Sequence, residues 1–248
     1  MKKNLSNTKW KKITTISLIL ITIVYSVMIG VKIFKIDNIK KPIKIGEVSN
    51  NNEIEMNSIS MGSHFSCAIK DDNSLWIWGN SNYSFIYGSQ PTKILDDVIS
   101  VKAGERWGSA ITLDGTLWVW GDDVFNKSSK PRKALENVIC TAQNAAIASD
   151  YTLWTWGDNY LGQLGDGTFE DSNAPKCVMH DVKYISSRGS RMAAIKTDGT
   201  LWMWGSNSRG NLGNGETDNS SVPVKVMDYV RYVDVGSDIL VAITEKNE

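Results

Sequence analysis

Hydrophobic residues recur along the chain in a five-residue unit, Leu-Trp-x-Trp-Gly, in which apolar side chains alternate. The copies occupy residues 75–79, 117–121, 153–157 and 201–205. In a β-strand this alternation places both tryptophans on one face, and the leucine with the variable residue on the other. Because both faces are then largely apolar, each strand must be covered on both sides, as happens when repeats pack against one another. The pattern predicts an array of similar β-units.

A shorter apolar run and a turn precede each copy of this unit. The runs occupy residues 67–70, 109–112, 145–148 and 193–196, and the turns contain Asp72-Asn73, Asp114-Gly115, Asp150-Tyr151 and Asp198-Gly199. Asn and Gly tolerate the positive φ that type I′ turns need, so we predict β-hairpins with such turns. Tyr151 breaks this preference, and its turn is expected to be the least regular.

All five prolines occupy one further position of the repeat. They are Pro42, Pro91, Pro131, Pro175 and Pro223, and each opens a short β-like segment. A proline is tolerated at the start of a strand or on an edge strand, where no backbone donor is required, which predicts the outermost strand of a small sheet. Another β-like run, such as residues 98–101, lies between proline and hairpin. Four short strands in units that start 36 to 48 residues apart (residues 75, 117, 153 and 201) are typical of propeller blades.

The third and fourth repeats continue with Gly162-Gln163-Leu164-Gly165-Asp166-Gly167 and Gly210-Asn211-Leu212-Gly213-Asn214-Gly215. With the Ala-Ile run, the Asp-Gly turn, Leu-Trp-x-Trp-Gly and the proline strand, these loops resemble the repeat family named for the regulator of chromosome condensation, over about residues 59–244. Residues 83–88 and 124–127 occupy the same loop position without the glycine pattern. The resemblance implies a closed seven-bladed toroid, whereas this chain contains four complete Leu-Trp strands.

We therefore predict an all-β, propeller-like array of four-stranded blades, four complete with partial terminal blades, that forms an open or incompletely closed ring. Three alternatives are kept. Pro42-Ile43-Lys44-Ile45 could close a tight ring, a dimer could complete the toroid, or the chain could be a truncated remnant of a longer repeat protein.

Residues 13–31 contain no charge and are rich in Ile, Leu and Val. A helix of that length, at ~1.5 Å per residue, nearly spans a hydrocarbon core of ~30 Å. We predict a basic segment at residues 1–12, a transmembrane helix at 13–34, a tether at 35–58 and the repeat domain at 59–248. A cleaved signal peptide is the alternative, but the apolar run exceeds the usual h-region. Lysines flank both ends, so the positive-inside rule discriminates little. The signal-like layout favours a cytoplasmic N-terminus and an extracytoplasmic repeat domain.

Charge argues against nucleic acid as a partner. Residues 1–35 hold seven Lys or Arg and no acid, so residues 36–248 carry 27 − 7 = 20 basic against 27 acidic residues, a net charge of −7. Nucleic-acid affinity depends mainly on a basic surface. Cys67, Cys140 and Cys177 are far apart and show no metal-ligand spacing, so we interpret them as buried structural thiols.

Candidate chemistry is sparse. The glycine-rich loop at residues 162–167 is not followed by a helix pattern or by Lys-Ser/Thr, so it does not match a phosphate-binding loop. Asp158, Asp166 and Asp171 do not match the spacing of a calcium loop. Only His64 and His180 could supply imidazole chemistry, and they lie in different repeats. We predict no catalytic, cofactor-binding or metal-binding residues.

The loops that follow each Trp-Gly carry the best candidates for partner binding, since loops on a rigid scaffold commonly hold binding residues. The candidates are Tyr83, Phe85, Tyr87, Phe125, Tyr160 and Arg209. Tyr and Arg are typical interface anchors, although these aromatics could instead fill gaps between degenerate blades. The leading hypothesis is a non-enzymatic, membrane-anchored module that binds a protein or a cell-surface component, with self-association as one way to complete the ring.

Other functions are kept as alternatives. One is a cell-surface hydrolase or another enzyme of unrecognised type. The resemblance also implies a guanine-nucleotide exchange factor, because members of the family include exchange factors for a small nuclear GTPase as well as a secreted β-lactamase inhibitor. The predicted membrane helix and the degenerate early loops disfavour that activity here. Fold alone does not decide among these functions.

Overall fold

The computed structural model describes residues 59–79, 88–121, 128–236 and 239–244, which form strands, turns and loops. Within these ranges, no helix has the length and apolar character needed to cross a membrane. The predicted membrane helix at residues 13–34 and the tether at 35–58 lie outside the described residues, as does the strand predicted at Pro42.

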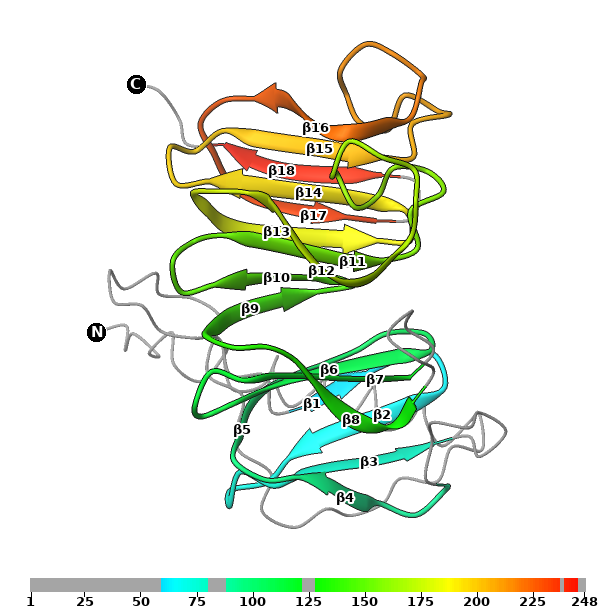
Figure 1. Cartoon of the computed structure of the whole chain (residues 1–248), viewed down its shortest axis with the longest axis vertical. Helices are drawn as coiled ribbons and strands as arrows, with labels where there is room; N and C mark the ends of the chain where they lie inside the picture. Colours follow the sequence, from blue (N-terminus) through cyan, green and yellow to red (C-terminus); the bar gives the residue numbers. More distant parts are fainter. Residues whose placement is uncertain (1–58, 80–87, 122–127, 237–238, 245–248) are drawn as a thin grey trace, which may run out of the picture. The chain divides into compact units, whose positions relative to one another are not determined.

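The described strands form antiparallel sheets in which neighbours in sequence are neighbours in space (Figure 1). Blade 1 contains β1 (Ile59–Met61), β2 (Phe65–Ile69), β3 (Leu75–Gly79) and β4 (Thr92–Leu95). Blade 2 contains β5 (Val98–Ala103), β6 (Trp107–Thr112), β7 (Leu117–Gly121) and β8 (Ser128–Leu135). Blade 3 contains β9 (Val138–Ala142), β10 (Ala145–Ala148), β11 (Leu153–Gly157) and β12 (Ser172–Met179). Blade 4 contains β13 (Val182–Arg188), β14 (Arg191–Lys196), β15 (Leu201–Gly205) and β16 (Ser220–Met227).

A fifth sheet of two strands follows, with β17 (Val230–Val235) paired to β18 (Leu240–Thr244). The prediction of four complete four-stranded blades and a partial terminal blade is therefore confirmed. Pro131, Pro175 and Pro223 lie in β8, β12 and β16, which are outermost in their sheets, and Pro91 directly precedes β4. The predicted edge position of the prolines is also confirmed, because an edge strand leaves their missing N–H without consequence. The prolines of β8, β12 and β16 do not open their strands as predicted, since these three strands begin before them.

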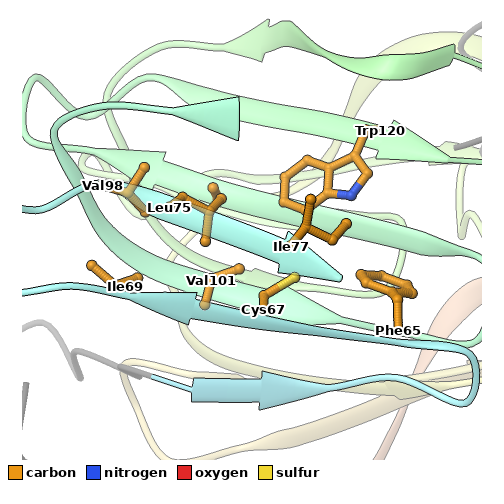
Figure 2. Close-up of a cluster of buried hydrophobic side chains, with 9 residues drawn as sticks. Phe65, Cys67, Ile69, Leu75, Ile77, Val98, Val101 and Trp120 are labelled. Carbon is orange, nitrogen blue, oxygen red and sulfur yellow. The ribbon is translucent and has the colours of Figure 1, made fainter. Parts of the chain in front are cut away.

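Consecutive blades pack through the predicted two-sided strands. Figure 2 shows Leu75 and Ile77 of blade 1 in one buried cluster with Trp120 of blade 2. Trp156 packs in the same way into the core that contains Leu117 of blade 2. Trp204 packs into the core of blade 3. Each leucine thus faces the following blade and each second tryptophan the preceding one, as the alternation predicted. Burial of one such indole stabilises the array by roughly 4–6 kcal/mol at most before entropy is subtracted.

The hairpin turns differ from the prediction. In blade 1 the Lys70 N–H donates to the Ser74 carbonyl at 3.0 Å, and the Asn73 N–H donates to the Lys70 carbonyl at 2.9 Å. Residues 71–73 form a three-residue loop in which only Asn73 has a positive φ, 61°. This is a type I turn followed by a left-handed residue, not a type I′ turn. The type I′ prediction is wrong because the loop is one residue longer than such a turn requires.

The turn at Tyr151 is as regular as the others, so that prediction is also wrong. Tyr151 takes φ 63°, and its N–H donates to the Ala148 carbonyl at 2.9 Å, as Asn73 and Gly199 do in their blades. A left-handed conformation costs a residue with a Cβ roughly 1–2 kcal/mol. The Asp150 carboxylate offsets part of this cost, because it accepts from the Thr152 N–H at 3.0 Å and from its hydroxyl at 2.6 Å.

The same carboxylate contact links the turn to the first tryptophan of the unit. In blade 4 the Trp202 indole N–H donates to the Thr200 hydroxyl at 2.9 Å, and that hydroxyl donates to Asp198 at 2.7 Å. Equivalent relays start from Trp76 and Trp154, and in blade 2 the Trp118 indole donates to the Thr112 hydroxyl. The first tryptophan is therefore half-buried with its polar atom satisfied at the turn.

The cysteines differ in exposure. Cys67 is buried in the blade 1 core, where desolvation raises the pKa of its thiol, and Cys140 is half-buried. Cys177 is exposed, so the prediction of three buried thiols is wrong for this residue. It lies in β12, an outermost strand with many exposed positions.

Candidate functional site

The loops that follow Trp-Gly lie at the same end of each blade as the turns between its first and second strands. In blade 4, Gly205 at the end of β15 pairs with Arg191 at the start of β14, which in turn pairs with Arg188 at the end of β13. Blade 1 has the same arrangement, with Gly79 opposite Phe65. We call this side of the blades the loop end, and the side with the Asp turns the hairpin end.

A buried asparagine organises the loop at residues 158–171. The Asn159 side chain is fully buried, and its amide nitrogen donates to the Thr168 and Glu170 carbonyls, both at 3.0 Å. Its side-chain oxygen accepts from the Leu164 N–H at 2.9 Å. One side chain thus ties together both arms of the loop.

The loop at residues 206–219 is built in the same way. Asn207 is also fully buried; its amide donates to the Glu216 carbonyl at 3.0 Å and accepts from the Leu212 N–H at 2.9 Å. Gly162 and Gly210 follow these asparagines with similar φ values, 79° and 69°. The two loops therefore share one conformation.

Asn159 and Asn207 were not among the residues that the sequence singled out. The signal was present, because repeats three and four read Trp-Gly-x-Asn, whereas Ser81 and Asp123 stand at that position in the first two repeats. Asparagine has both donor and acceptor atoms in one short side chain, which suits it to close a loop on itself. The glycine pattern alone did not reveal this role.

The loop of blade 3 also covers the next blade. The Trp204 indole N–H donates to the Gln163 carbonyl at 3.0 Å, and Leu164 is buried beside it in the loop. A Cβ on Gly165 would lie 2.6 Å from the Trp204 ring nitrogen, so this position requires glycine. The loop is therefore fixed to two blades, which holds its exposed residues in place.

Asp166 and Asp171 have structural roles in this loop. Asp171 accepts from the Asn159 N–H at 2.6 Å, and Asp166 accepts from Lys176 at 2.5 Å. Partial burial of Asp166 opposes ionisation, but hydrogen bonds from Lys176 and Thr168 outweigh this effect and lower the pKa of its carboxyl group. Within the described ranges, no group of three or more His, Cys, Asp or Glu side chains could hold a metal ion.

Two of the six candidate binding residues are described, and both are exposed at the loop end. Tyr160 is 67% exposed in the loop of blade 3, so it does not fill a gap between blades. Arg209 is exposed in the loop of blade 4. Leu161, next to Tyr160, and Arg209 line one pocket of about 410 Å³. Tyr83, Phe85, Tyr87 and Phe125 lie outside the described residues.

A larger cavity of about 1030 Å³ is lined by the innermost strands and by the turns at the loop end. Its charged lining residues have both signs: Lys102, Arg106 and Arg188 against Glu105, Asp158 and Asp234. The rings of Tyr184 and Tyr232 meet in its wall with centroids 5.2 Å apart. Burial and the contact with Tyr232 raise the pKa of Tyr184, so its hydroxyl is neutral.

Antiparallel four-stranded sheets that pack face to face through repeated aromatic strands define a β-propeller-type repeat protein. Family models for the regulator of chromosome condensation (RCC1) repeat match residues 152–192 and 198–243, and a second model of that repeat matches residues 57–84. The chain is therefore an RCC1-like repeat protein, which confirms the family resemblance seen in its sequence.

Solved structures agree in fold. Prp20p from Saccharomyces cerevisiae is 16% identical, with a TM-score of 0.66, and the match covers 84% of this chain and 60% of that one. Human WBSCR16 is 21% identical, with a TM-score of 0.62, over 77% of this chain and 58% of that one. The chain thus spans about three fifths of these proteins. Among curated proteins, none matches the sequence.

Proposed function

We propose that the protein is a non-enzymatic, membrane-anchored repeat module that binds a protein or a cell-surface component through its loop end. The observation that carries this proposal is the construction of two loops around Asn159 and Asn207, which hold Tyr160 and Arg209 exposed at one end of the blades. Such preorganisation lowers the entropy lost on binding.

Related folds support a protein as the partner. The structure of Prp20p was described with its binding properties to Gsp1p and histones, and yeast RCC1 was solved with Kap60 bound to it. These proteins are less than 25% identical to this chain, which spans 60% and 52% of them, so their partners are not transferred. Nothing in the described residues favours a hydrolase, an exchange factor or a remnant over a binding module.

Affinity capture with the full chain in its native membrane tests the binding proposal. We expect the double variant Tyr160→Ala/Arg209→Ala to lose partners that the unchanged chain recovers. The matched control is Leu113→Ala/Arg231→Ala, which removes an exposed apolar side chain and an exposed arginine near the hairpin end. Equal recovery by both double variants would show that the loop end is not the binding surface.

The membrane anchor is proposed from residues 13–31, which contain no charge. Cys177 gives a direct test of orientation because its thiol is exposed in β12. A membrane-impermeant maleimide should label intact cells that produce the chain, and Cys177→Ser should remove the label. Labelling only after cell lysis would contradict an extracytoplasmic repeat domain. Release of the chain from membranes by alkaline carbonate would contradict the anchor.

Self-association, the remaining proposal, would appear as a doubled molecular mass in detergent.

A further inference from the structure

The contacts between consecutive blades join two different faces. In the contact of blades 1 and 2, Cys67 and Ile69 lie on the face toward the following blade, and Val101 and Trp120 lie on the face toward the preceding blade (Figure 2). All four side chains are at most 2% exposed. These positions are therefore dry where two blades meet.

The fifth sheet exposes its face toward a following blade. Aligned by strand register, Val241 and Ile243 of β18 occupy the positions of Cys67 and Ile69 in β2. Val241 is 58% exposed and Ile243 is 46% exposed. Large apolar side chains thus contact water at positions that are buried between the other blades.

Blade 1 exposes the opposite face. By register, Ile59 and Trp78 occupy the positions of Val101 and Trp120 in blade 2. Ile59 is 48% exposed and Trp78 is half-buried. Met61 lies two residues after Ile59 on the same face of β1 and is 77% exposed. The strand that elsewhere inserts a tryptophan into the preceding blade is therefore left partly exposed.

These two exposed faces are the two halves of one kind of contact, because blade 1 presents the tryptophan strand and β18 presents the positions that receive it. They do not bury each other within one chain, since Ile59 and Val241 are both exposed. A second copy of the chain supplies the missing half on both sides, whereas an unrelated partner would have to imitate a blade twice. Burial of the exposed apolar surface favours this contact.

We propose that the fifth sheet of one copy packs against blade 1 of a second copy, in the way that consecutive blades pack within the chain. Such a contact joins different faces of the two copies, so it is heterologous and builds a closed ring or a filament. The proposal rests on the self-association in the proposed function and names its surfaces. It does not depend on the loop end.

Chemical cross-linking between two singly substituted chains tests which faces meet. Ile59→Cys and Val241→Cys are each made in a full chain that carries Cys177→Ser, which removes the exposed native thiol. Their counterparts Val101 and Cys67 lie in one core, so a short bismaleimide should join the two chains when they are mixed in detergent micelles. Either chain alone should form no dimer, because the two faces differ. Leu113→Cys, exposed at the hairpin end, replaces Val241→Cys in the matched control and should give none.

Sedimentation equilibrium of the full chain measures the strength of the contact. We expect Val241→Lys/Ile243→Lys to weaken self-association by about tenfold or more, because it places charges in an apolar contact. Val222→Lys/Met227→Lys changes two exposed apolar residues of β16 and should leave self-association unchanged. Thermal unfolding of both variants should match that of the unchanged chain, since all four side chains are exposed.

Different results would overturn different parts of the account. A monomer at every concentration would contradict self-association altogether and leave these faces to the tether at 35–58 or to another protein. An assembly that survives Val241→Lys/Ile243→Lys, or cross-links only between like chains, would contradict the faces named here and leave self-association standing. In each case, capture that still depends on Tyr160 and Arg209 would preserve the binding function of the loop end.

Discussion

The two ends of the blades differ in how much their sequence varies between repeats. At the hairpin end, all four complete blades carry Asp-x-Ser/Thr before Leu-Trp. In each of them the indole N–H of the first tryptophan donates to a Ser or Thr hydroxyl at the turn. At the loop end, the two described long loops depend on Asn159 and Asn207, which the first two repeats lack. A uniform end indicates a constraint on folding, whereas an end that varies between repeats is free to carry recognition.

The packing strand between the two ends should give the largest effect on stability. Trp204→Ala removes a fully buried indole that contacts blade 3 and the Gln163 carbonyl, and we expect a loss of about 3–5 kcal/mol. Trp202→Ala is the matched control, because that ring is only half-buried and its removal should lower the free energy of unfolding less. Chemical denaturation measures both. Equal losses would contradict the assignment of the second tryptophan to the contact between blades.

Loss of the loop organiser should come next. Asn159→Ala leaves the Leu164 N–H and the Thr168 and Glu170 carbonyls without this partner, so we expect a loss of about 1–3 kcal/mol. The variant should also lose partner capture, because Tyr160 is no longer held in place. Asn173→Ala, an exposed position in β12, is the control. If Asn159→Ala preserved both stability and capture, the loop would not need this residue.

A smaller effect is expected at the hairpin end. Tyr151→Gly removes the strain of a left-handed tyrosine but adds chain entropy to the unfolded state, so stability should rise by about 1 kcal/mol at most. The same change at Leu113, which is exposed in another turn and has no positive φ, should not stabilise. Destabilisation by Tyr151→Gly would show that the tyrosine ring makes a contact worth more than the backbone strain.

The smallest effect concerns pH. The carboxyl groups of the turn aspartates all have pKa values below the ordinary 3.8. For Asp72, Asp150 and Asp198 the main cause is hydrogen bonds from the Ser or Thr two residues later, and for Asp114 it is the hydrogen bond from the Thr112 hydroxyl. A carboxyl group whose pKa is lower in the folded state contributes stability at pH values above its pKa in the unfolded state. This stability is lost as the pH falls through the pKa in the folded state. The unfolding temperature should therefore decrease below about pH 4, and Asp198→Asn should flatten part of that decrease. Unfolding temperatures of both proteins across this range measure the difference, and identical pH profiles would contradict a role for this carboxylate.

The repeated strands could be predicted from sequence because apolar alternation and proline chemistry are local properties. Leu75 and Trp120 meet in one core because the alternation places the leucine on the face toward the following blade and the second tryptophan on the face toward the preceding one. The turn type could not be predicted from Asp-Gly pairs, because hydrogen bonds from Ser74 or Thr200 to the preceding aspartate fix a longer loop. Arg191 was also missed, because its guanidinium donates to the Gly236 carbonyl, which follows β17 and lies 45 residues further along the chain.

Site-specific photo-crosslinking tests the central claim most directly. A benzoylphenylalanine residue at Tyr160, in the full chain within its native membrane, should form a covalent adduct with the partner. The same probe at Leu113, an exposed position at the hairpin end, should form none. An adduct at Leu113 and none at Tyr160 would contradict recognition through the loop end.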